Sequence, residues 1–133
     1  MSRLEEVPVF AKNFDGFLHY LRDAAVPSVS ISPKRFGRVL NVDMQTLAAM
    51  AHVHRNTLSR APEAESVQRY LRQTVQVVRA AVDVAGSVED AIFWFRNHPL
   101  PTFDYKTSQQ LVSEGRTEAL IRYIQSLQAG FAG

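Results

Sequence analysis

The stretch VDMQTLAAMAHVHRNTLSR, from Val42 to Arg60, contains the most informative helix pattern of this sequence. Asp43 has the kind of side chain that accepts hydrogen bonds at a helix N-terminus, so a helix is expected from Met44 to about His52. A second short helix is expected from about His54 to Arg60, with Leu58 packing back on the first. This pattern predicts a helix-turn-helix, in which the second helix enters the major groove of DNA.

Helical patterns continue on both sides of this stretch. Apolar residues at helical spacing predict an N-terminal helix over about Asp15 to Ala25, and Ser32-Pro33 is typical of a helix start. Between them, the alternating segment from Val26 to Ser32 is short and contains a proline, so we expect a connector there. The longest helix is expected from Pro62 to Ala85, where Gly86 ends it.

The C-terminal third predicts shorter helices separated by turns. Ser87 to Asp90 resembles a capping box ahead of the apolar run AIFWF, and Thr107 to Gln110 is a better one, for a helix that ends at Gly115. The segment NHPLPTF between them is not expected to be helical, because its prolines lack N–H donors. A last helix is expected from Thr117 to Gln128, closed by Gly130 and followed by the tail FAG. The chain is therefore predicted to be all-α.

The composition excludes several classes of protein. A length of 133 residues suits one compact domain or two small lobes that share a core, and 46% hydrophobic residues are typical of a folded globular protein. Because there is no cysteine, disulfides, thiol nucleophiles and thiolate zinc sites are excluded. The N-terminus lacks the apolar core of a secretory signal, and the apolar runs are too short for a membrane span. A cytoplasmic protein is therefore expected.

The distribution of charge is more informative than the net charge of +2. Residues 32–80 hold eight Lys or Arg against three Asp or Glu, a net charge of +5, whereas the rest of the chain sums to −3. This clustering favours a polyanionic partner for the middle of the chain, although solvated surface explains each single charge equally well.

The sequence gives little support to catalysis or metal binding. It contains neither a nucleophile-elbow motif nor a glycine-rich phosphate loop, and its acidic residues fall at helix starts, where capping explains them. His52 and His54 are close in sequence, but no third His or carboxylate stands at a helical offset that would complete a metal site. We therefore expect no enzyme activity, no metal and no cofactor.

DNA binding is the remaining interpretation of the basic middle. When Leu47, Ala48, Val53 and Leu58 pack inward, the side chains that face outward are His54, Arg55, Asn56, Ser59 and Arg60. An Arg side chain can read guanine and an Asn side chain adenine, while Thr and Ser hydroxyls suit phosphates. The alternative is a solvated helix on an all-α domain, but the turn pattern and the basic window together favour DNA. The predicted DNA-binding residues are Gln45, Thr46, His54, Arg55, Asn56, Thr57, Ser59 and Arg60.

Val42 to Arg60 resembles the helix-turn-helix of Xre-type, Cro-like repressors. In that pattern the position of His52 is usually glycine, and the position of His54 is usually a serine that caps the recognition helix. The second half resembles the toxin-binding domain (DUF2384) of the Xre/MbcA/ParS antitoxins, although Trp94-Phe95 and TFDYKTS replace the family's Trp-Leu and Leu-Gly-Gly-x-Thr-Pro. The residues that carry this second resemblance are Ala91, Trp94-Phe95, Asn97, Pro99-Leu100, Thr107 to Val112, Glu114-Gly115 and Ile121 to Gly130.

The resemblance covers roughly residues 32–133 and implies an antitoxin of a type II toxin–antitoxin pair. Such antitoxins bind a RES-domain toxin that degrades NAD⁺, cover its active-site cleft with their C-terminal region, and repress the shared operon by binding operator DNA. Because operators are usually palindromic, a homodimer is expected. The implied organisation is an N-terminal helical extension (1–31), a Cro/Xre-like helix-turn-helix region with the long helix (32–85), and a small helical toxin-binding domain (86–133).

The resemblance also indicates which residues would contact the toxin. Aromatic side chains in a segment stiffened by prolines make well-ordered interface anchors, and a small C-terminal tail could thread a narrow cleft. Core packing is the simpler explanation for at least one of Trp94 and Phe95, and disorder is the simpler explanation for the tail. The candidate toxin-binding residues are Trp94, Phe95, Leu100, Phe103, Tyr105, Gly130, Phe131, Ala132 and Gly133.

Two other functions fit the same residues. One is a toxin-binding protein whose helix-turn-helix no longer binds DNA, and the other is a stand-alone DNA-binding regulator whose C-terminal domain senses a ligand or a partner. Binding to the chain's own upstream DNA and the identity of the neighbouring reading frame distinguish these functions.

Overall fold

The computed structural model describes residues 6–22 and 30–132, and this part of the chain is mostly helical. It contains eight α-helices, one short 3₁₀ helix and one two-stranded antiparallel sheet, in agreement with the predicted all-α class. None of the helices in these ranges is long and apolar enough to span a membrane. The elements are α1 (Phe14–Leu21), α2 (Pro33–Leu40), α3 (Met44–Ala51), α4 (Arg55–Arg60), α5 (Glu65–Ala85), α6 (Val88–Asn97), β1 (Pro99–Leu100), η1 (Pro101–Phe103), β2 (Lys106–Thr107), α7 (Ser108–Ser113) and α8 (Thr117–Ala132).

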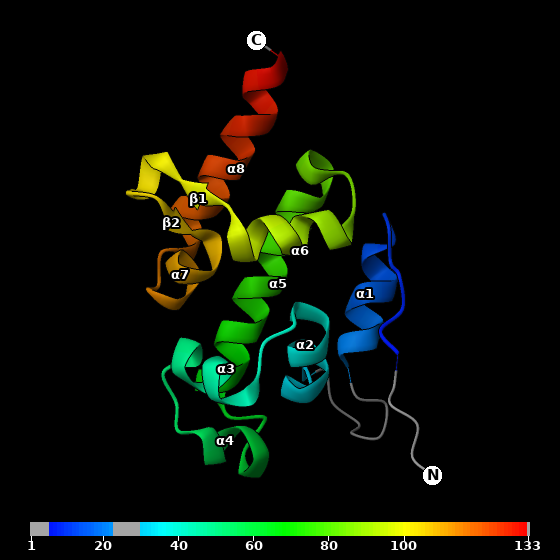
Figure 1. Ribbon diagram of the computed structural model, residues 1–133, viewed down its shortest axis with the longest axis vertical. Helices are drawn as coiled ribbons and strands as arrows, with labels where there is room; N and C mark the ends of the chain where they lie inside the picture. The colour runs from blue at the N-terminus through cyan, green and yellow to red at the C-terminus, as the bar shows by residue number, and fades with distance from the viewer. Residues whose placement is uncertain (1–5, 23–29, 133) are drawn as a thin grey trace.

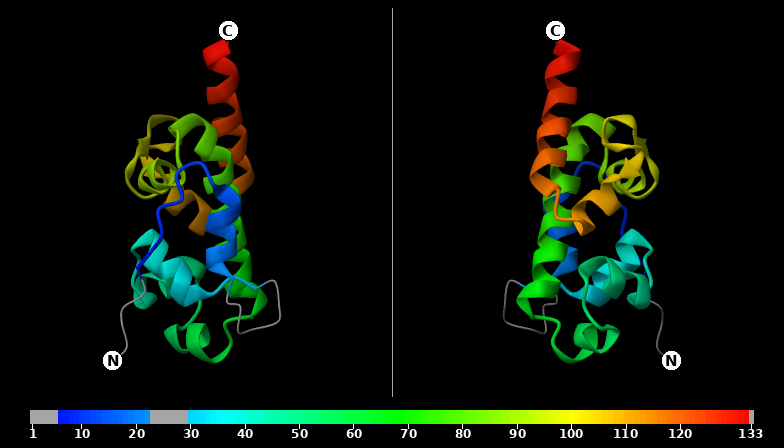
Figure 2. Two further views of the ribbon diagram at one scale, coloured as in Figure 1. Left: turned by 90° about the vertical axis from the view of Figure 1, so that its right-hand side faces the viewer. Right: turned by 90° about the vertical axis from the view of Figure 1, so that its left-hand side faces the viewer.

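Helix α5 runs along the middle of the molecule, and the other elements pack around it (Figure 1). Helices α2, α3 and α4 lie toward its N-terminal end, α7 packs against its middle next to α3, and α6, the small sheet and α8 lie toward its C-terminal end. The predicted apolar stripe of α5 is buried from Val67 to Val82, which explains why the longest helix lies at the centre. The C-terminal end of α8 projects beyond the other elements at one pole of the molecule, and α4 lies at the opposite pole (Figure 2).

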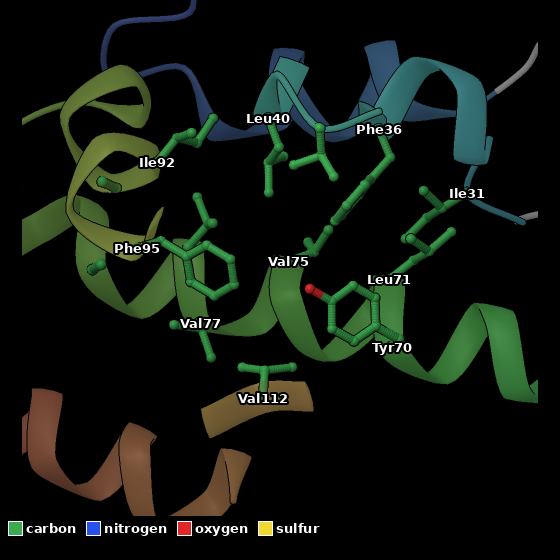
Figure 3. Close-up of a cluster of buried hydrophobic side chains, with 14 of the residues drawn as sticks. Ile31, Phe36, Leu40, Tyr70, Leu71, Val75, Val77, Ile92, Phe95 and Val112 are labelled. Carbon is green, nitrogen blue, oxygen red and sulfur yellow. The ribbon is translucent and has the colours of Figure 1, made fainter. Parts of the chain in front are cut away.

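One hydrophobic cluster of described residues connects the three predicted segments. Phe17 from the N-terminal segment, Phe36 from the middle and Phe95 from the C-terminal third are all fully buried in it. Burial raises the pKa of Tyr70 in this cluster to about 12, so its hydroxyl is neutral at physiological pH. The side chains that meet in Figure 3 include Ile31, Phe36 and Leu40 before α5, Tyr70, Leu71, Val75 and Val77 on α5, and Ile92, Phe95 and Val112 after it.

The N-terminal segment covers part of this core. Phe10 and Phe17 are buried and meet edge to face, with ring centroids 5.5 Å apart. The Glu89 carboxylate on α6 accepts hydrogen bonds from the backbone N–H groups of Phe10 and Ala11, at 2.6 and 3.0 Å. The Val88 N–H in turn donates to the Ala11 carbonyl at 2.7 Å. The segment is therefore fastened to the start of α6, and its aromatic side chains belong to the core.

Most of the predicted helix starts and stops are confirmed. Four predicted capping residues each accept, through a side-chain oxygen, a hydrogen bond from the backbone N–H three residues later, at 2.7 to 3.2 Å. Gly86 ends α5 with φ 104°, a conformation that glycine adopts at least cost. The four capping residues are Ser32, Asp43, Ser87 and Thr107, and the last of them forms a complete capping box with Gln110.

Helices α5 and α1 have boundaries that differ from the sequence prediction. Helix α5 begins at Glu65 and not at Pro62, because Ala61 to Ala64 first form a turn closed by a 3.0 Å hydrogen bond between the N–H and the carbonyl of its end residues. Helix α1 ends at Leu21, and the predicted end at Ala25 lies outside the described residues.

The sequence does not predict the small sheet. Pro99-Leu100 pairs antiparallel with Lys106-Thr107, and Pro101 to Phe103 form a 3₁₀ turn between the two strands, so the proline-rich segment is indeed not α-helical. In the predicted connector, of which residues 30–32 are described, Ile31 forms an isolated antiparallel bridge with Arg22. Strands this short give no periodic signal, which is why the sequence does not reveal them.

Candidate nucleic-acid interface and partner-binding residues

Two histidines build the turn between α3 and α4. His52 ends α3 in the left-handed conformation, with φ 60°, and its N–H bonds to the carbonyls of Ala48 and Ala49. This conformation costs a residue with a Cβ about 1 kcal/mol relative to glycine. His54 caps α4, because its ring Nδ1 accepts a hydrogen bond from the Asn56 N–H at 3.1 Å. The two histidines therefore occupy a turn position and a cap position.

The side chains predicted to contact DNA lie on the solvent side of this helix pair. Leu47, Ala48 and Leu58 are buried and Val53 is half-buried, so the predicted inward face is confirmed. Thr57 is half-buried as well. The other seven predicted residues are exposed: Gln45, Thr46, His54, Arg55, Asn56, Ser59 and Arg60.

A surface hollow of about 490 Å³ separates α4 from the N-terminal end of α2. Arg55, Asn56 and Ser59 line it from α4, and Lys34 lines it from the first turn of α2. An anion in this hollow would meet two cationic side chains close to the positive end of a helix dipole. The sequence does not single out Lys34, because only the packing of α2 brings it to the hollow. The remaining lining residues are Ser32, Pro33, Met44, Leu58 and Pro62.

A larger hollow, of about 570 Å³, lies between α1, α5 and α8. Its charged lining residues are Lys12, Asp15, Arg79 and Asp83, so basic and acidic groups balance there. Since it has no excess positive charge to attract a polyanion, the hollow at α4 is the better candidate for nucleic-acid binding.

The Asp43 carboxylate caps α3 and interacts electrostatically with Arg55 of α4. Asp43 Oδ1 accepts a hydrogen bond from the Thr46 N–H at 2.7 Å. The hydrogen bonds from Thr46 and, to a smaller extent, the positive charge of Arg55 hold the pKa of Asp43 below its ordinary value. The Asp43 cap therefore stays ionised well into the acidic range.

Asp43 is expected to make the stability of the protein depend on pH. Because its folded pKa lies below the unfolded one, the cap stabilises the fold above about pH 4 and loses this effect as the pH falls through the folded pKa. Asp43→Ala should therefore lower Tm at neutral pH and lower it less at about pH 3. Asp43→Asn, which keeps a capping oxygen without the charge, is the control. Thermal melts across this range test the prediction, and a Tm difference between wild type and Asp43→Ala that does not change with pH would contradict it.

Three of the candidate toxin-binding residues are part of the core. Phe95, Leu100 and Phe103 are 0%, 1% and 8% exposed, so they cannot contact a partner unless the core opens. Phe103 packs edge to face on Tyr123, with centroids 5.6 Å apart, and the Arg116 guanidinium covers its ring at 5.2 Å. This finding corrects the prediction of direct contact for all three residues.

In the described part of the C-terminal region, the exposed aromatic residues are Phe93 and Tyr105, and Trp94 is partly exposed. Tyr105 is 70% exposed, and Trp94 is half-buried with its ring stacked on His98 at a centroid distance of 6.2 Å. Phe93, which the sequence does not distinguish from its neighbours, is 69% exposed on α6. The run AIFWF is apolar throughout, so only the packing of α6 on α5 decides which of its rings face solvent.

Tyr105 stands on a strained turn. Asp104 and Tyr105 both have positive φ, 57° and 65°, and each costs about 1–2 kcal/mol because neither is glycine. The Tyr105 N–H donates to the Leu100 carbonyl at 2.8 Å, and the next residue, Lys106, forms an ion pair with Glu114 at 2.8 Å. The turn is therefore held by its neighbours while the Tyr105 ring points into solvent.

The predicted C-terminal tail belongs largely to a helix. Helix α8 continues through Gly130 to Ala132, so the prediction that Gly130 ends the helix is wrong. A glycine within a helix costs only about 1 kcal/mol relative to alanine, which one position can tolerate. Gly130 is exposed, the side chains of Phe131 and Ala132 are not described, and Gly133 lies outside the described residues. The backbone from Gly130 to Ala132 is therefore helical and not an extended tail.

Among the residues that the structure describes, no group of three or more His, Cys, Asp or Glu side chains could hold a metal ion. In comparisons with known proteins, no family model, no curated protein and no solved structure matches this chain. The case for each candidate site therefore rests on the residues of the chain itself.

Proposed function

We propose that this chain is the antitoxin of a type II toxin–antitoxin pair, which binds and occludes a RES-type toxin and represses its own operon. In this proposal α3 and α4 act as an Xre- or Cro-like helix-turn-helix, and α4 enters the major groove of operator DNA. The observation that carries the proposal is the joint exposure of the polar residues of α3 and α4, except half-buried Thr57, on the side opposite buried Leu47, Ala48 and Leu58.

The chemistry of α4 suits both base reading and phosphate binding. Arg55 and Asn56 are neighbours in its first turn, where side chains of a recognition helix reach base edges. Ser59 and Arg60, one turn further on, and Lys34 across the hollow suit the phosphates that flank such a site. Base readers and phosphate contacts on the same side of a short helix favour sequence-specific DNA binding over general solvation.

The partner surface in this proposal comprises the exposed aromatic residues and the projecting end of α8. Phe93, Trp94 and Tyr105 expose ring area, and aromatic side chains are enriched among the residues that contribute most to binding. The α8 segment from Gln125 to Ala132 carries no charge, so it can enter a cleft without leaving a buried ion. Two copies of the chain would read the two halves of a palindromic operator.

The test is co-expression of the tagged chain with the product of its neighbouring reading frame. The proposal predicts that the neighbouring product lowers cellular NAD⁺ and arrests growth when expressed alone, and that the chain restores growth and co-purifies with it. Co-purification without binding to upstream DNA would indicate a toxin-binding protein with a degenerate helix-turn-helix. DNA binding with neither growth rescue nor co-purification would indicate a stand-alone regulator.

A further inference from the structure

His52 makes a second contact besides ending α3. Its ring Nε2 lies 2.8 Å from the carbonyl oxygen of Ser113, the last residue of α7, and 3.3 Å from the Ser113 hydroxyl. A carbonyl oxygen only accepts hydrogen bonds, so Nε2 must carry the proton in this contact. The Ser113 hydroxyl donates to the Met50 carbonyl at 2.7 Å. Met50 lies in the last turn of α3, where carbonyl groups lack partners within the helix. The C-terminal end of α3 is therefore bound by α7 through two hydrogen bonds.

Helix α7, which ends at Ser113, is held in place by contacts at both of its ends and by its buried residues. Its N-terminus is held by the Thr107–Gln110 capping box, and Leu111 and Val112 are buried in the core. At its C-terminal end, Glu114 binds the Lys106 ammonium through both carboxylate oxygens, at 2.8 and 2.9 Å. These contacts fix the position of Ser113 in the C-terminal region of the molecule.

Helix α4 depends on its neighbours for its position. It has six residues, too few for a stable helix by itself, and Leu58 is the residue of α4 that is buried in the core. Its start follows directly on the turn at His52 to His54. A small rotation of this turn would change the direction of the whole helix, and with it the positions of Arg55 and Asn56.

We propose that His52 and Ser113 are positioning residues. Their contacts attach the end of α3 to α7 and thereby fix the position of α4, so that DNA reading depends on the C-terminal region. The statement about DNA reading rests on the proposed function, whereas the placement of α4 does not. The contact also gives a reason for a histidine in the left-handed position. Glycine would fit the backbone there better, but it cannot reach Ser113.

The test compares three variants with the wild type in Tm, in hydrogen exchange of the α4 amides, and in affinity for a duplex of the chain's own upstream DNA. His52→Gly relieves the left-handed backbone and removes the ring, so Tm should be maintained while α4 exchanges faster. Its affinity for the duplex should fall about fivefold, the equivalent of one neutral hydrogen bond, with an unchanged salt slope because no phosphate contact is lost. His52→Gln, whose Nε2 can reach the Ser113 carbonyl, should restore affinity and exchange although its backbone is as strained as that of histidine.

Ser113→Ala removes the hydrogen bond to the Met50 carbonyl but keeps the backbone carbonyl that His52 contacts, so it should change α4 exchange and affinity in the same direction as His52→Gly. The double variant, which removes both contacts, should lose more than either single variant. Ser126→Ala is the matched control, since the Ser126 hydroxyl also bonds a backbone carbonyl, that of Tyr123 at 2.6 Å, but on α8. It should change neither α4 exchange nor affinity. Unchanged α4 exchange in His52→Gly and Ser113→Ala would overturn the positioning role, as would affinities that follow Tm across all variants. Should the wild type not bind the duplex, faster α4 exchange in both variants would still uphold the positioning role, and only the operator proposal would fall.

Discussion

Phe95→Ala is expected to destabilise the protein by about 3–5 kcal/mol, a loss large enough to leave a small domain marginally folded. Phe95 is fully buried where α6 meets α5, so truncation removes a whole aromatic ring from the central cluster and leaves a cavity. Chemical denaturation, with the free energy of unfolding extrapolated to water, measures the effect.

The matched control is Phe93→Ala, the same substitution two residues earlier on the same helix. Phe93 is 69% exposed, so its truncation should change the free energy of unfolding by less than about 1 kcal/mol. Instead it should weaken co-purification of the partner, if Phe93 belongs to the partner surface. Equal destabilisation by the two substitutions would show that α6 does not bury Phe95 and expose Phe93.

Arg55→Ala is expected to weaken binding to upstream DNA by about tenfold or more, because a bidentate contact between an Arg and a base is worth roughly 1–3 kcal/mol. Asn56→Ala should have an effect of similar size, and each variant should discriminate less between the natural duplex and one altered at the base pair that it reads. Fluorescence anisotropy titrations at one fixed salt concentration measure both quantities. Neither variant should lower Tm appreciably, since both side chains are exposed.

Arg122→Ala removes the same charge from an exposed position on α8, a helix that extends to the pole of the molecule opposite α4 (Figure 1). It should leave the affinity for DNA within about twofold of the wild type, since charges this far from the interface are screened. A loss equal to that of Arg55→Ala would mean that net charge alone, and not α4, determines the binding.

Local signals in the sequence predict most of the fold. Asp43, Ser32, Ser87 and Thr107 are capping residues that act within three residues of their own position, so the helix starts can be recognised without knowledge of the tertiary structure. The start of α5 is the exception, because Pro62 marks a turn that precedes the helix and no side chain caps the helix itself.

Tertiary packing decides most of what the sequence leaves open about the candidate sites. The exposure of Arg55 and Asn56 follows from the spacing of buried residues, so it is predictable. The burial of Phe95 beside exposed Phe93 is not, because the two rings belong to one uninterrupted apolar run. The turn at Asp104 and Tyr105 contains no glycine, and therefore nothing in the sequence signals its left-handed backbone.

Whether α3 and α4 form a surface that reads DNA can be measured by a titration of the wild-type protein. Affinity is measured for the duplex upstream of the coding sequence and for a scrambled duplex of equal length, over a series of salt concentrations. If α3 and α4 read the operator, the logarithm of the binding constant should fall linearly with the logarithm of salt concentration, and the natural duplex should bind at least about 10³-fold more tightly than the scrambled one. Equal affinity for the two duplexes, or no salt-sensitive binding to either, would contradict DNA reading by α3 and α4.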